Sequence, residues 1–260
     1  MPARVRFAAA ALLLCGIGSA QDAFEVASVK PSDPKEEYVQ WLTYPGGRIV
    51  VANYTLTMLI EEAYGMSLYR IGRGPRWADE DVYSITAKAP AGSAAAAFIP
   101  ATPNAAPPPE LRAMMQTLLA DRFGLKIHRE TRELPVYALV VAKGGPKLKP
   151  AHDPSAAPRS AIRNGEIEAQ NRDVPWLIAV LERHVERTIL DRSGLTGTYD
   201  LDIKFDARPL DAAARVEAPA DSTWSWLNTA LQTQLGLRLE ATKGAVEVLV
   251  IDEAKKPSAN

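Results

Sequence analysis

The sequence predicts an α/β fold, in the broader α+β sense, made of two tandem diverged copies of one helix-on-sheet sandwich unit. Two observations support this prediction: residues 47–125 resemble residues 165–237, and short strand patterns alternate with amphipathic helix patterns. An amphipathic helix needs an apolar partner for its buried stripe, and a sheet supplies one. The length of 260 residues allows one or two such cores.

The internal similarity runs through three stretches that keep the same order in both copies. The paired stretches are residues 47–60 with 165–178, 82–86 with 198–202, and 118–125 with 230–237. In the first pair, Asn53 and Asn171 fall in register. A repeated order of this kind indicates duplication. The sequence therefore predicts two domains, residues 21–150 and 151–260, each with the order strand–helix–strand–strand–helix–strand–strand.

The first copy begins with residues 47–52, a β-branched run after a glycine turn that predicts a strand. Asn53 or Thr55 can cap the following helix, which carries its apolar residues on one face and ends at Gly65. The strongest helix pattern covers residues 110–123 and ends before a glycine. Further strands are predicted near residues 69–71, around 83–87, at 125–128 and at 136–142.

The second copy repeats this order, and each copy contains one linker. Runs rich in alanine and proline predict flexible linkers at residues 89–109 and 206–221. Helices are predicted at residues 175–186 and 222–235, and strands at 166–170, 198–205, 237–240 and 246–251.

Residues 1–20 have the pattern of a secretory signal peptide. Arg4 and Arg6 precede an apolar run, and small residues at 18–20 precede Gln21. Cleavage there predicts a periplasmic or secreted protein with no stable membrane span. An uncleaved leader would instead act as a membrane anchor.

The composition and motifs argue against several classes of function. Cys15 is the only cysteine and lies inside the leader, so the mature chain has no thiol for a disulfide, a nucleophile or a metal site. A formal net charge of −1 and the lack of a basic run argue against nucleic-acid binding. His128, His152 and His184 lack metal-ligand spacing, and the Gly-x-Ser-x-Gly motif is absent. We therefore predict no catalytic residue, no metal and no cofactor.

One glycine turn carries the best candidate binding residues. Arg73, Arg76 and Trp77 lie in or beside the run Gly-Arg-Gly-Pro-Arg-Trp, where two cations and an indole can hold an anionic or aromatic partner. The alternative is structural: Trp77 covers the core beneath the turn, and the arginines are simply solvated.

Several stretches, taken together, resemble a known family across nearly the whole chain beyond Gln21. They are residues 24–31, 119–123, 144–148, 191–200 and 250–258. On these stretches the chain resembles a soil-associated family of exported bacterial proteins that carries a domain of unknown function. The resemblance implies no established activity. Some relatives look like sensory domains joined to membrane metallopeptidases, but the His-Glu-x-x-His motif of such peptidases is absent here.

Each half also resembles, at the level of fold, the short N-terminal domain of secretins and TonB-dependent receptors. The apolar run of residues 227–237, which ends in Leu-Gly-Leu, is similar to the second half of that domain. This resemblance implies a module that docks to other proteins in the periplasm without catalysing a reaction, although fold alone does not establish function.

These observations favour a non-enzymatic binding module of the cell envelope, whose partner is a protein or envelope component bound through strand edges or the Arg/Trp turn. Two alternatives remain open: an extracytoplasmic hydrolase that uses carboxylates, and a sensory domain that serves a separate membrane peptidase. A deep pocket with convergent ionisable groups would favour the enzyme, and shallow grooves with open strand edges would favour the binding module.

Overall fold

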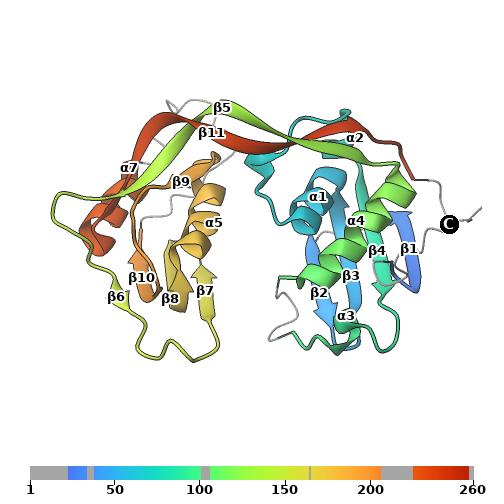
Figure 1. Cartoon of the computed structure of the whole chain (residues 1–260), viewed down its shortest axis with the longest axis horizontal. Helices are drawn as coiled ribbons and strands as arrows, with labels where there is room; N and C mark the ends of the chain where they lie inside the picture. Colours follow the sequence, from blue (N-terminus) through green and yellow to red (C-terminus); the bar gives the residue numbers. More distant parts are fainter. Residues whose placement is uncertain (1–22, 34–37, 101–105, 164, 206–224, 258–260) are drawn as a thin grey trace, which may run out of the picture. The chain divides into compact units, whose positions relative to one another are not determined.

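The computed structural model describes residues 23–33, 38–100, 106–163, 165–205 and 225–257. These residues form a mixed α+β fold with eleven strands in three sheets, which confirms the predicted fold class (Figure 1). They divide into two compact units that interleave along the chain, and each is described by itself. The first comprises the described residues within 23–64, 81–124 and 255–257, and the second comprises those within 65–80 and 125–254. The predicted signal peptide and the predicted linker at 206–221 lie outside the described residues.

The first unit is an antiparallel sheet packed against two helices. The strand order is β1-β4-β3-β2, with β1 at Val26–Pro31, β2 at Gln40–Tyr44, β3 at Arg48–Thr55 and β4 at Val82–Lys88. The helices are α1 (Leu56–Tyr64) and α4 (Pro109–Phe123). Alternate residues of β3 and β4, such as Ile49 and Ile85, are buried, as expected for a sheet with one covered face. In this core the rings of Tyr83 and Phe123 meet edge to face at 5.1 Å.

Both helices of the first unit match their predictions because their apolar residues recur every three or four positions. In α1, Leu56, Leu59, Ile60 and Ala63 are buried. The hydroxyl of Thr55 accepts a hydrogen bond from the N–H of Met58 at 3.3 Å, as a cap should. Helix α4 ends at Gly124, whose φ of 55° is left-handed and whose N–H donates to the carbonyl of Leu119.

The predicted linker at 89–109 is partly wrong, because described residues within it are ordered against the first unit. Ala89 and Ala95 are buried. The hydroxyl of Ser93 accepts the N–H of Ala96 at 3.1 Å and caps a short helix, α3 (Ala94–Ala97). Alanine is the best helix former, so an alanine-rich run is ambiguous between linker and helix.

The second unit contains a long two-stranded ribbon, and here the predicted strands are wrong in extent. Strand β5 (Lys126–Val141) pairs along nearly its whole length with β11 (Leu237–Glu253). The sequence predicts four short strands in these two regions because charged residues interrupt the apolar runs. In the ribbon such residues pair across the strands instead, as Arg129 does with Glu247. A third strand, β9 (Ile189–Asp191), pairs with β5 in parallel.

The ribbon also crosses the boundary that the repeat predicts. Its two strands come from opposite sides of the predicted boundary between residues 150 and 151, yet they are hydrogen-bonded partners. The two compact units therefore do not coincide with the two domains that the repeat predicts.

The remaining sheet of the second unit is antiparallel, with the order β6-β10-β8-β7. Its strands are β6 (Lys149–Pro150), β7 (Arg159–Arg163), β8 (Glu166–Asp173) and β10 (Thr198–Lys204). Its inner face packs on α5 (Val174–Val185) and α7 (Ser225–Ala230), and α7 continues as a π-helical turn, η2 (Leu231–Leu235). Ile167, Leu177, Ile203 and Leu231 are fully buried in this core. Residues that alternate with the inner ones form an outer face.

The segment before α2 (Trp77–Glu80) is not the strand predicted near 69–71. Residues Leu68–Arg70 form a 3₁₀ turn, η1, in which the N–H of Arg70 donates to the carbonyl of Ser67 at 2.8 Å. After this turn, Ile71 makes a single parallel bridge with Leu249 of β11.

The two predicted repeats share a local feature at the strand–helix junction. Asn53 and Asn171 both have left-handed φ angles, 57° and 54°, at bulges that precede α1 and α5. Each side-chain amide donates to a carbonyl of an earlier loop, that of Tyr38 or Pro154, at 3.0 Å. Asparagine is one of the few residues that tolerate this backbone conformation. The duplication itself remains a prediction.

Two left-handed glycines at helix ends provide a test of the packing. A Cβ at Gly124 would meet only the flexible side chain of Lys255 at 3.6 Å, whereas a Cβ at Gly236 would lie 2.1 Å from the carbonyl oxygen of Gly145. We expect Gly124→Ala to cost about 1 kcal/mol from backbone strain alone. Gly236→Ala should cost at least twice as much in urea unfolding, because the loop carrying Gly145 must move. Equal costs would contradict this packing.

Candidate binding surfaces

The outer face of the β6-β10-β8-β7 sheet carries charged side chains in cross-strand rows. In one row, Glu166 of β8 lies between Lys204 of β10, at 3.1 Å, and Arg163 of β7, at 3.7 Å. The hydrogen bond with Glu166 raises the pKa of Lys204 above its ordinary value. In the next row, Glu168 lies opposite Asp202, and Arg163 reaches Glu168 at 3.3 Å.

Strand β7 is an outer strand of this sheet, and all of its residues except the partly buried Ala161 are exposed. Ala161 pairs with Glu168 in the register of the two strands. On its other side, β8 is hydrogen-bonded to β10 through the partners of Leu201 and Ile203. Glu168 lies between those two partners, so its own main-chain groups face β7. It follows from the alternation of an antiparallel ladder that the N–H and C=O groups of Ser160 and Ile162 point away from the sheet. No strand among the described residues pairs with them.

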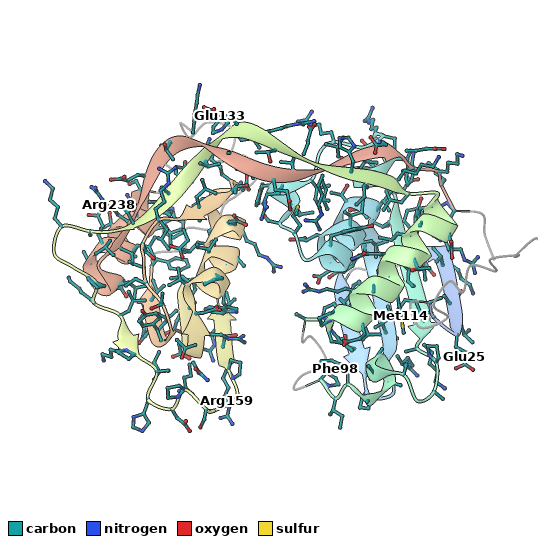
Figure 2. The ribbon with its side chains drawn as sticks, viewed as in Figure 1. Glu25, Phe98, Met114, Glu133, Arg159 and Arg238 are labelled. Carbon is teal, nitrogen blue, oxygen red and sulfur yellow. The ribbon has the colours of Figure 1, made fainter. Side chains whose placement is uncertain are left out.

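The side chains of β7 add an apolar and a basic element to this edge. Ile162 is 52% exposed although it lies on the inner face. Arg159 and Arg163 occupy the two ends of the strand on the outer face; Arg159 is labelled in Figure 2. Arg163 shares its charge with Glu166 and Glu168, whereas Arg159 lies opposite the uncharged Gln170. The edge therefore presents main-chain donors and acceptors together with positive charge.

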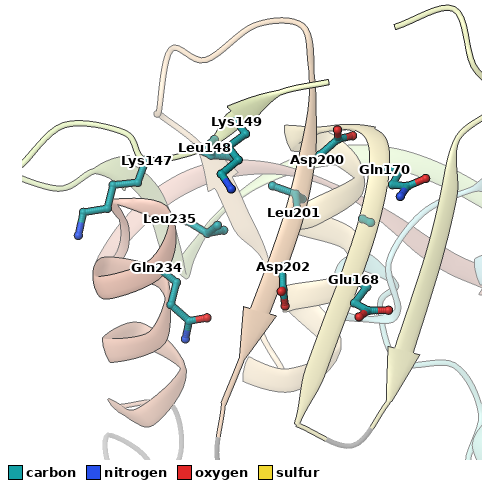
Figure 3. A pocket seen from close by; sticks show the side chains of 11 residues that line it. Lys147, Leu148, Lys149, Glu168, Gln170, Asp200, Leu201, Asp202, Gln234 and Leu235 are labelled. Atoms are coloured by element: carbon teal, nitrogen blue, oxygen red, sulfur yellow. The ribbon is translucent and has the colours of Figure 1, made fainter. Parts of the chain in front are cut away.

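Away from β7, the outer face of the sheet contains an open hollow of about 590 Å³ beside β10. Figure 3 shows Lys147, Leu235 and Gln234 on one side of β10, and Glu168 and Gln170 of β8 on the other. Lys149, Asp200 and Asp202 complete the polar lining. The volume suits a small ligand, but the hollow is wide open rather than enclosed.

Three hydrogen bonds hold the loop at the side of this hollow. Gly236 adopts a φ of 66° at the end of η2, and its carbonyl accepts the N–H of Ala142 at 2.9 Å. The N–H of Lys147 donates to the carbonyl of Leu235 at 2.8 Å, and its ammonium group donates to the carbonyl of Thr233. These bonds turn residues 145–147 toward η2 and away from β10.

The structure places the three predicted binding residues on the segment that contacts β11. Arg73 is exposed and lines a second open hollow of about 350 Å³ with Gly74, Pro75 and residues 251–254. Arg76 is largely solvated and forms an ion pair with Glu80 at 2.6 Å. Trp77 is half-buried. Their role in binding remains a prediction.

The three histidines lie apart and in different surroundings. Nδ1 of His128 lies 2.9 Å from a carboxylate oxygen of Asp252, and its other nitrogen lies 3.7 Å from Glu130. The hydrogen bond with Asp252 raises the pKa of His128. Burial lowers the pKa of His184, whose ring meets Phe205 at 5.4 Å. Within the described ranges, no three His, Cys, Asp or Glu side chains form a group that could hold a metal.

Sequence reasoning missed both β7 and the hollow. One signal for β7 was available, since the dipeptide Asn-Gly at residues 164–165 predicts a two-residue hairpin turn, and the strands on either side of it, β7 and β8, are antiparallel partners. Nothing in the sequence links Gln234 to Lys204, which the fold brings into contact.

The fold and these surfaces define an α+β protein with shallow hollows and open strand edges. Residues 57–254 match the family model described as "Protein of unknown function (DUF3738)". The chain therefore belongs to the DUF3738 family. No curated protein and no solved structure matches it. None of the helices in the described part of the chain is long and apolar enough to cross a membrane.

The contact between His128 and Asp252 predicts a specific dependence on pH. The pKa of His128 is raised in the folded state, so its charged form stabilises the fold at pH values below about 6.5, the unfolded value. This contribution is lost as the pH rises through the raised folded pKa. An NMR titration should show the raised pKa, and Asp252→Asn should lower it toward 6.5. An unchanged pKa in Asp252→Asn would contradict this assignment.

Proposed function

We propose that this protein is an exported, non-enzymatic binding module of the cell envelope that takes an extended segment of a partner protein along β7. The observation that carries the proposal is the open edge of β7, where the main-chain groups of Ser160 and Ile162 point away from the sheet. An extended peptide can add to such an edge as a further strand, with its main chain supplying the hydrogen bonds.

The exposed side chain of Ile162 supports the same proposal. A protein usually blunts an edge strand with charges, proline or a covering segment, because an open apolar edge invites aggregation. Here the arginines at the ends of β7 supply charge, but Ile162 between them remains 52% exposed. Added peptide would cover this side chain and bury its apolar surface.

The arginines also discriminate between partners. If a second copy paired with β7 in an antiparallel register centred on Ala161, Arg159 of each copy would lie opposite Arg163 of the other. Like charges directly opposite are destabilising, so self-pairing is disfavoured. A segment with carboxylates four residues apart would instead face both arginines with opposite charges. The edge therefore favours an acidic extended segment.

The export prediction places this edge where it can meet envelope proteins, in the periplasm or outside the cell. Docking without catalysis is also what the similarity of each half to the short domain of secretins and TonB-dependent receptors implies. The family resemblance also implies an association with soil bacteria, which is part of the same proposal.

A pair of synthetic peptides tests the edge. We expect the acidic peptide Glu-Thr-Val-Thr-Glu to bind and to slow amide hydrogen exchange at Ser160 and Ile162. The matched peptide Lys-Thr-Val-Thr-Lys should bind at least tenfold more weakly. Ser160→Pro removes one outward N–H at a position where an edge strand tolerates proline, and it should weaken acidic-peptide binding about fivefold, since a lost hydrogen bond costs about 1 kcal/mol.

The control is Val26→Asp, which places a charge at an exposed apolar position of the first unit. This variant should bind the acidic peptide as the parent does. Equal binding of the two peptides, or protection that appears only outside β7, would contradict the proposal.

Export has its own test, which does not depend on the binding partner. Expressed in a bacterium with its leader, the protein should be recovered from the periplasm or the medium with Gln21 as its first residue by N-terminal sequencing. Recovery from the membrane with residues 1–20 still attached would show that the leader acts as an anchor.

A further inference from the structure

We infer that the hollow beside β10 is a second binding site, which takes one planar primary carboxamide, with its N–H and C=O on the same side, on the main chain of Asp202. This inference does not depend on the proposed role of β7, which forms the other edge of the sheet.

The first step concerns the direction of the main-chain groups. Ile203 pairs with Ile167 of β8, so the N–H and C=O groups of Asp202 and Lys204 point to the other side of β10. The bond from the N–H of Lys204 to Oε1 of Gln234, at 2.9 Å, confirms this direction. On the same side, Asp200 pairs with Lys149 of β6.

The second step is the gap that these contacts leave. If β6 continued backward from Lys149, Lys147 would be the partner of Asp202. The N–H of Lys147 donates to Leu235 instead, so the ladder stops one residue short. Among the described residues no main-chain group takes its place. The donor and acceptor of Asp202 therefore face the hollow.

Gln234 shows which chemistry fits this edge. Its carboxamide accepts from the N–H of Lys204 and donates to the carbonyl of the same residue at 2.6 Å. A carboxamide thus already pairs with β10 as a neighbouring strand would. Asp202 presents the same pair of groups two residues earlier in the strand. A ligand carboxamide can satisfy both, whereas an ester offers only an acceptor.

The lining of the hollow disfavours a simple anion. The side chains of Glu168, Asp200 and Asp202 bring negative charge, and the ammonium group of Lys147 is already bonded to a carbonyl. A neutral amide avoids the repulsion that an anion would meet from these carboxylates.

The test titrates the ¹⁵N-labelled protein with N-acetylglycinamide and, as the matched control, with the neutral diester methyl acetoxyacetate, in which ester groups replace both amides and no N–H donor remains. We expect a saturable shift of the Asp202 amide with a dissociation constant in the millimolar range. The ester should bind at least tenfold more weakly. An equal shift with the ester, or no saturable shift with the amide, would overturn the inference.

Two substitutions separate the main chain from the side chain. Asp202→Pro removes the outward N–H without removing a donor to β8, and it should weaken amide binding at least tenfold. Binding to this variant is measured from the NMR signals of the Gln234 side chain. Asp202→Ala keeps the N–H and should bind as the parent does. Loss of binding in Asp202→Ala but not in Asp202→Pro would place the site on the carboxylate and overturn the inference. If Asp202→Pro does not fold, the comparison of amide with ester decides.

Discussion

The pairing of β5 with β11 is the constraint on which the rest of the second unit depends. It joins the middle of the chain to its end through an antiparallel register that runs from Lys126–Glu253 to Val141–Leu237. At one end of the ribbon, Leu139 and Leu237 enter the core beneath the β6-β10-β8-β7 sheet. The ribbon thereby fixes where η2 ends, and through Gln234 it sets one side of the hollow.

The same sheet presents two different edges because its strands differ in length and in neighbours. Strand β6 is only two residues long, so β10 is covered for part of its length and open at Asp202. Strand β7 has a full partner in β8 but none on its outer side within the described chain. One edge therefore suits a single amide, and the other suits an extended segment. Both conclusions follow from hydrogen bonds that an antiparallel ladder leaves unmade.

The sequence predicted elements whose pattern is local and missed those that depend on a distant partner. Helices α1, α4 and α5 appear in it because three- and four-residue spacing survives in any context. The sequence predicts separate short strands in place of the ribbon because the polar residues at its centre pair only with residues more than a hundred positions away, such as Arg129 with Glu247. The Arg/Trp turn was found from composition, whereas the Asp202 gap depends on Lys147 and Gln234, which the sequence does not bring together.

The central claim is that a partner segment adds to the sheet at β7. Isotope-edited NMR of the protein with the bound acidic peptide tests it most directly, through contacts between main-chain protons of the two chains. The account predicts cross-strand contacts from the peptide to Ser160 and Ile162, in a regular two-residue repeat. Contacts to the Arg73 turn or to the outer face, without contacts to β7, would contradict it.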